Sequence, residues 1–160
     1  MERLDESKVA DRRSQFVPLL LYGLLVGTIS GAALGLVMKL FGEITGTGIY
    51  VLLLNVDFIA WLPHPMTERF EFVLHMLVAL PIGILFIAML RVWTSPLGVG
   101  LGMGAAIACC TWIPLTQMSE RTPSTADLAA LSWWIAGHLV YGVVLAGLGF
   151  IWMMKGWDKR

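Results

Sequence analysis

Residues 22–43 of the chain read YGLLVGTISGAALGLVMKLFGE, an apolar run in which glycine recurs at every fourth position. These positions are Gly23, Gly27, Gly31 and Gly35. In a helix in water each glycine would cost about 1 kcal/mol relative to alanine. In a bilayer the same residues let helix backbones approach closely, and tight packing then holds the helices together. The run therefore predicts a membrane helix that packs closely against other helices.

Three further apolar runs follow, in a chain of 160 residues that is 58% apolar and 14% charged. Its mean hydropathy is +0.78. Crossing a hydrocarbon core takes about 20 apolar residues, and four runs are this long. We expect spans at 16–41, 70–92, 97–118 and 129–154. The predicted fold is an all-α, integral membrane four-helix bundle, with short tails at 1–15 and 155–160 and no soluble domain.

The distribution of lysine and arginine predicts the orientation in the membrane. With four spans, both tails lie on the same side as Arg91, and that side carries eight basic residues. The outer connections carry Arg69 and Arg121. Because basic residues concentrate in cytoplasmic segments, both termini are expected to be cytoplasmic, in a plasma membrane. The net charge is zero and gives no indication of a nucleic-acid partner; the expected partner is the lipid bilayer.

The first outer connection contains a second, shorter apolar stretch, IYVLLLNVDFIAWL at residues 49–62. Fourteen residues are too few to span the membrane, and Asp57 interrupts the stretch. Three interpretations remain open: an interfacial helix on the outer leaflet, a re-entrant segment that dips into a polar cavity, and a folded-back apolar loop.

Ionisable residues near the outer end of the bundle are the candidate site. In the second span Glu71 and His75 are four residues apart and lead a stripe of small residues, and His138 leads another in the fourth span. Small-residue stripes mark helix interfaces, so both histidines are expected to point inward. Lys39, Glu43 and Asp57 add charge at the same end; Lys39 and Glu43 have the spacing of a helical ion pair.

Four roles remain open for these histidines. The first is structural, with each histidine hydrogen-bonded between helices. The second is a proton- or solute-handling cavity that the histidines line together with Glu71, because intramembrane ionisable residues are functional candidates. A metal site of Glu71, His75 and His138 and a bis-histidine haem are further alternatives; no cofactor is the default expectation. The sequence contains no nucleophile elbow, P-loop, HExxH or CxxC motif, so we expect no enzymatic activity.

Further glycines predict how the later spans pack. The third span offers Gly98 and Gly102, or alternatively a second stripe with Gly100 and Gly104. The fourth span offers Gly142 beside His138. We expect Gly98, Gly102 and Gly142, together with the first-span ladder, to lie at helix interfaces.

Several of these segments together resemble a known group of proteins. They are VMKLFGE at 37–43, LHM at 74–76, GVGLGMGAA at 98–106 and GHLVYG at 137–142. Over residues 16–152 the chain resembles small bacterial inner-membrane proteins of the YagU-like kind and, secondarily, the YqhR-like membrane proteins. The resemblance implies a compact four-span inner-membrane protein and supplies no catalytic mechanism.

Two classes of function follow from the sequence. One is a small transport or proton-responsive protein that uses the outward-facing polar cluster. The other is a structural or interaction module whose glycine stripes pack against a second copy or a larger membrane complex. A polar cavity at the histidines favours the first class, and glycine stripes left exposed by the bundle favour the second.

Overall fold

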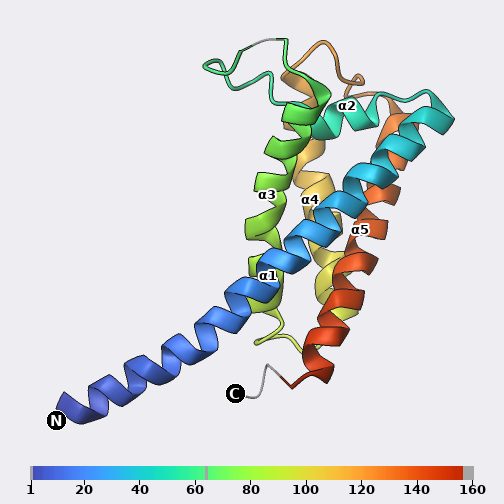
Figure 1. The fold of residues 1–160 in the computed structure, drawn as a ribbon. Helices are drawn as coiled ribbons and strands as arrows, with labels where there is room; N and C mark the ends of the chain where they lie inside the picture. Colours follow the sequence, from blue (N-terminus) through green and yellow to red (C-terminus); the bar gives the residue numbers. More distant parts are fainter. Residues whose placement is uncertain (1, 64, 157–160) are drawn as a thin grey trace.

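The computed structural model describes residues 2–63 and 65–156, with side chains described from residue 16 onward. In this part of the chain there are five helices and no strand: α1 (Glu2–Thr45), α2 (Ile49–Leu54), α3 (Glu68–Met89), α4 (Pro96–Gln117) and α5 (Leu128–Met154). The Phe16–Thr45 part of α1 and the whole of α3, α4 and α5 are long and apolar enough to cross a membrane. The predicted all-α fold with four spans is confirmed. Residues 2–15, expected as a tail, continue α1 as a helix that projects from the bundle (Figure 1).

Local chemistry sets the helix ends. Thr67, Ser95 and Asp127 cap α3, α4 and α5, because each side chain accepts a hydrogen bond from the backbone N–H three residues later. Such a cap satisfies one of the four unpaired N–H groups at a helix start. At the other end of α1, Gly46 has a φ of +71°, which glycine adopts without steric cost. The first span therefore continues to Thr45, beyond the expected residue 41.

The four spans pack as two pairs that are consecutive among the spans, α1 with α3 and α4 with α5. The glycine ladder of α1 lies against α3. A Cβ added at Gly27 would lie 2.5 Å from the carbonyl oxygen of Ala79, and one added at Gly31 would lie 2.5 Å from the Ala79 Cβ. Gly23 and Gly35 face Ile84 and Phe72 in the same way. All four glycines are thus at the interface where the sequence places them.

The second pair uses a different stripe of α4 from the one expected. Gly100 and Gly104 face the α5 backbone at Gly142 and His138. A Cβ added at Gly98 would meet only Ser95 of its own helix cap, and one at Gly102 would meet nothing within 4 Å. The two stripes are two residues apart and thus about 200° apart around a helix, so only one can face α5. Gly142 lies at the interface as expected; Gly98 and Gly102 do not.

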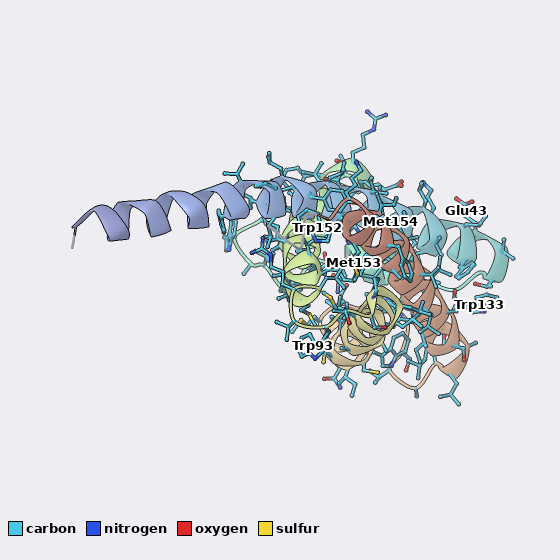
Figure 2. The ribbon with its side chains drawn as sticks, turned by 90° about the horizontal axis from the view of Figure 1, so that it is seen from below. Glu43, Trp93, Trp133, Trp152, Met153 and Met154 are labelled. Carbon is cyan, nitrogen blue, oxygen red and sulfur yellow. The ribbon has the colours of Figure 1, made fainter. Side chains whose placement is uncertain are left out.

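The two pairs join along α1 and α5. Met38 packs on Gly137, and the Tyr22 hydroxyl donates a hydrogen bond to the Leu148 carbonyl at 2.8 Å. The α3 and α4 helices contact one another much less. Seen from below, Trp152 lies beside α1, whereas Trp93 lies at the outer edge of the bundle, away from α1 (Figure 2). The bundle is therefore closed along α1–α5 and looser along α3–α4.

The apolar stretch at 49–62 divides into a buried half and an exposed half. In α2, Ile49 and Leu52 are fully buried and Leu54 is 2% exposed, and the helix packs against α1 and α3 at the end of the bundle opposite the termini (Figure 1). Beyond it the chain turns, and Trp61 is 83% exposed. The stretch is not one continuous interfacial helix, because only its first six residues form a helix and they lie inside the bundle end.

Candidate functional site

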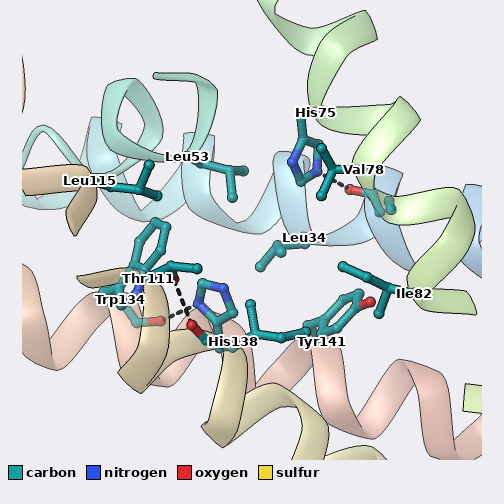
Figure 3. Close-up of a pocket in the computed structure, with 13 residues that line it drawn as sticks. Leu34, Leu53, His75, Val78, Ile82, Thr111, Leu115, Trp134, His138 and Tyr141 are labelled. Atoms are coloured by element: carbon teal, nitrogen blue, oxygen red, sulfur yellow. Dashed lines mark hydrogen bonds between the residues drawn. The ribbon is translucent and has the colours of Figure 1, made fainter. Parts of the chain in front are cut away.

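A cavity of about 110 Å³ lies inside the bundle between the two histidines. Figure 3 shows His75 of α3 and His138 of α5 on opposite walls. All five helices line the cavity, through Gly31, Leu34, Leu53, His75, Val78, Ala79, Ile82, Ile107, Thr111, Leu115, Trp134, His138 and Tyr141. The structure thus brings the two candidate histidines to one space, as their small-residue stripes predict.

Backbone carbonyls fix which nitrogen of each ring carries hydrogen. The Nε2 atom of His75 lies 3.1 Å from the Gly31 carbonyl oxygen, and the Nδ1 atom of His138 lies 2.9 Å from the Trp134 carbonyl oxygen. A carbonyl only accepts, so both of these nitrogens donate. In the neutral ring the other nitrogen then has a free lone pair. These are Nδ1 of His75 and Nε2 of His138, and the latter faces the cavity (Figure 3).

Two hydroxyl groups complete the polar part of the lining. Thr111 donates its hydrogen to the Ile107 carbonyl at 2.6 Å. Tyr141 is 2% exposed, and its buried hydroxyl has no hydrogen-bond partner. The Ser30 hydroxyl, which donates to the Val26 carbonyl at 2.7 Å, lies close enough to interact with the Tyr141 hydroxyl. The Tyr141 hydroxyl is therefore shielded from the cavity, and the polar atoms that the lining offers to a ligand are those of the histidine rings.

The structure places Glu71 outside this cavity. Its side chain is 5% exposed and pairs with Arg121, whose Nη1 atom lies 3.0 Å from Glu71 Oε1 and 3.2 Å from Asp57 Oδ1. The hydrogen bond to Glu71 is the main reason that the pKa of Arg121 is raised. Glu71 is one turn closer to the helix end than His75, where the loop after α4 reaches it. The expected grouping of Glu71 with both histidines therefore does not form.

Lys39 also has a different partner from the expected one. Its Nζ atom lies 2.7 Å from Glu68 Oε1, and the Tyr50 hydroxyl donates to the same oxygen at 2.9 Å. Burial, and then the hydrogen bond to Glu68, raise the pKa of Tyr50 to about 12. Glu43 is exposed and makes no ion pair with Lys39. Lys39, Glu43 and Asp57 thus belong to the rim at the α2 end of the bundle and do not line the cavity.

The geometry bears directly on the metal and haem alternatives. Among the described residues, no three histidine, cysteine, aspartate or glutamate side chains are arranged to hold a metal ion. Glu71, His75 and His138 in particular do not converge. Ligand pockets for drug-sized molecules have volumes of about 300–1,000 Å³, and a cavity of about 110 Å³ is too small for a haem. Neither alternative fits the residues present.

Arg121 is the residue that the sequence reasoning did not connect to the site. Arg121 donates hydrogen bonds to Asp57, in the loop after α2, and to Glu71 of α3, and so links these two elements. The signal in the sequence was its position as one of two basic residues in the outer connections, among several carboxylates. A buried carboxylate needs a cation nearby, and Arg121 was one of the few cations available.

No protein-family model matches the chain, and the comparison with curated proteins and with solved structures found none that is similar. The resemblance to YagU-like and YqhR-like proteins therefore stays a prediction.

Proposed function

We propose that this multi-pass membrane protein is a non-enzymatic, transport-type protein that binds a small solute in the cavity between His75 and His138. The observation that carries this proposal is the cavity itself, where two histidines of different spans each have a ring nitrogen free for a ligand. Few polar groups that converge in an otherwise apolar pocket are typical of small-molecule sites. The absence of a catalytic motif from the sequence agrees with a binding role.

The position of Glu71 favours one of the two transport-type roles, solute binding, over a response to protons. A carboxylate beside a histidine would favour the charged ring, but Glu71 is paired with Arg121, and the cavity lining contains no aspartate, glutamate, lysine or arginine. Binding of a solute is therefore better supported than a response to protons. The ion pairs at the outer rim then serve to hold the α2 end of the bundle over the cavity.

The proposed location is a bacterial inner membrane, with both termini in the cytoplasm. The end of α5 and the connection between α3 and α4 lie at the end of the bundle from which the first part of α1 projects (Figure 1). The sequence segments on this side carry eight of the eleven lysines and arginines, and those on the α2 side carry three. The asymmetry agrees with the positive-inside rule and with what a YagU-like or YqhR-like protein implies.

Cysteine labelling tests whether solutes reach the cavity. In a background without Cys109 and Cys110, Thr111→Cys places a thiol in the lining, and Ala108→Cys places one on the same helix at a position that is 1% exposed and packed in the core. Thiols react as thiolates, which need water. We expect the small neutral reagent methyl methanethiosulfonate to modify the Thr111→Cys protein and not the Ala108→Cys protein. Equal lack of reaction at both positions would refute a solute-accessible cavity.

A second candidate function has its own supporting observation. Gly98 and Gly102, which do not contact another helix of the bundle, line a shallow groove of about 330 Å³ on the outer side of α4. An exposed glycine pair at this spacing is typical of helix-association faces in membranes. The alternative is a module that associates with a second copy or a larger membrane complex. Gly102→Leu would then change the oligomeric state in light scattering; an unchanged state would contradict this alternative.

A further inference from the structure

We propose that the ligand of the histidine cavity is an uncharged amphiphile with a hydroxyl head group, which enters from the bilayer between α3 and α4. This inference rests on the proposed solute-binding function and adds the chemical class of the ligand and its route.

The free polar groups of the cavity select a hydrogen-bond donor. Nδ1 of His75 and Nε2 of His138 are acceptors in the neutral rings, as their bonds to the Gly31 and Trp134 carbonyls require. The Tyr141 hydroxyl points toward Ile82 (Figure 3) and is fully buried, so it offers the ligand no bond. A hydroxyl group donates a hydrogen, so one such group matches an imidazole lone pair. An ether or a ketone brings no hydrogen to the imidazole nitrogens.

The rest of the lining excludes a charged or bulky head group. Most lining side chains are aliphatic or aromatic, and no carboxylate or arginine is among them. Transferring an unpaired ion into such surroundings is very costly. A dry cavity of about 150 Å³ accepts one benzene molecule, so about 110 Å³ limits the enclosed part of the ligand to a small head group. A longer molecule must leave its tail outside.

The mouth of the cavity faces the lipid. Val78 lines the cavity, yet 62% of its surface is exposed on the outside of the bundle. It lies ten residues from Glu68 and eleven from Met89, or about 15 Å from either end of α3 at a rise of about 1.5 Å per residue. This is the middle of a hydrocarbon core that is about 30 Å thick. The α3 and α4 helices also contact one another little, so a tail can lie between them.

The outer end of the bundle offers no comparable entrance. Leu53 of α2 forms part of the cavity wall, and its neighbours Leu52 and Leu54 are buried. Beyond α2, Arg121 bridges Asp57 and Glu71. The geometry therefore favours entry of the ligand from the bilayer over entry from the external water.

Two isomeric probes test the class of ligand. The full-length protein in lipid nanodiscs is unfolded thermally with 1-octanol or with heptyl methyl ether, which has the same atoms and an acceptor oxygen but no donor. A ligand that binds the folded state raises the midpoint in proportion to its binding. We expect octanol to raise the midpoint relative to the ether. Losing one hydrogen bond in a buried site weakens binding about fivefold to tenfold. Equal responses to the two isomers, or no response to either, would overturn the proposal.

Variants then locate the effect. His138→Phe keeps the bulk of the ring and removes the acceptor, so the octanol response should fall about fivefold to tenfold. Val78→Trp covers the mouth from the lipid side and should abolish the response, whereas Leu77→Trp, equally exposed on the same helix but outside the lining, should keep it. If His138→Phe does not fold, the Val78 and Leu77 pair decides. An unchanged response in Val78→Trp would overturn lateral entry.

The labelling of Thr111→Cys separates a wrong ligand class from the lack of any solute-binding cavity. If Thr111→Cys is labelled but octanol has no advantage over the ether, the cavity takes a water-soluble solute and only the class and route are wrong. If Thr111→Cys is inert as well, both proposals fail.

Discussion

Among the described glycines, Gly83 of α3 leaves the least room for a Cβ atom because it faces the α1 backbone, and replacing Gly83 with alanine should separate the two helices. A Cβ at this position would lie 2.5 Å from the Gly27 Cα and still closer to the Gly27 nitrogen and the Gly23 oxygen. All three are backbone atoms, which cannot rotate away as a flexible side chain can. An ordinary contact at a Cβ is 3.4–4 Å long, so α1 and α3 must move apart by about 1 Å, enough to lose a quarter to a half of each dispersion contact along the interface.

The expected cost follows from comparing Gly83→Ala with Gly102→Ala. Overpacking of a tight interface typically costs about 1–3 kcal/mol, while alanine is favoured over glycine in a helix by about 1 kcal/mol. The second contribution cancels between the variants, because both positions are mid-helix and Gly102 has open space around it. Gly83→Ala should therefore be less stable than Gly102→Ala by about 1–3 kcal/mol.

Reversible unfolding of the purified protein in mixed detergent micelles, followed by circular dichroism, measures this difference. Gly147→Ala serves as a second reference, because a Cβ there also meets nothing within 4 Å. If Gly83→Ala is as stable as both reference variants, then α1 and α3 do not approach as closely as the geometry requires, and the explanation of the glycine ladder is refuted.

Three further predictions concern the end of the bundle that carries α2. Arg121→Gln leaves the buried Glu71 without its cation and should lower the unfolding free energy by about 2 kcal/mol. This is less than for a fully buried pair, because half of Arg121 is exposed. Adding Glu71→Gln should restore part of the loss, and additive losses in the double variant would contradict the pairing. In an ultraviolet titration, the difference between wild type and Tyr50→Phe should show one tyrosine ionising near pH 12. Because this folded pKa lies above the unfolded value of about 10, the stability contribution of Tyr50 is full below pH 10 and is lost as the pH rises toward 12. Ionisation near pH 10 in the folded protein would contradict the contact with Glu68. With the native cysteines removed, a Ser124→Cys protein should react with an impermeant maleimide added outside intact cells; labelling only after lysis would reverse the proposed orientation.

The four spans and their glycine packing could be predicted from the sequence because both depend on regular spacing along one helix. The contact of Gly27 with α3 is an example, since the ladder marks the interface without naming the partner. The choice between Gly100 and Gly102 was not predictable in the same way. Both belong to a four-residue stripe, and the side of α4 that faces α5 depends on the position of the whole helix.

The site was predictable to the extent that each histidine follows the interface of its own helix. The meeting of His75 and His138 at one cavity agrees with that reasoning. The separation of Glu71 from them has another origin, since it depends on a loop residue, Arg121, that is fifty positions away in the sequence. Contacts between a loop and a distant helix follow no periodicity, so patterns within one span do not reveal them.

The pairing of consecutive spans has a consequence for how the chain assembles. The first and second spans form one helical hairpin and the third and fourth another, and each hairpin encloses its own glycine contacts. During synthesis each hairpin can form its own helix contacts before it packs against the other hairpin. His75 belongs to the first and His138 to the second, so the cavity exists only after the two halves have docked along α1 and α5. A chain divided between Arg91 and Ser95 would keep both hairpins, and its two fragments would form the cavity only by associating with one another in the bilayer.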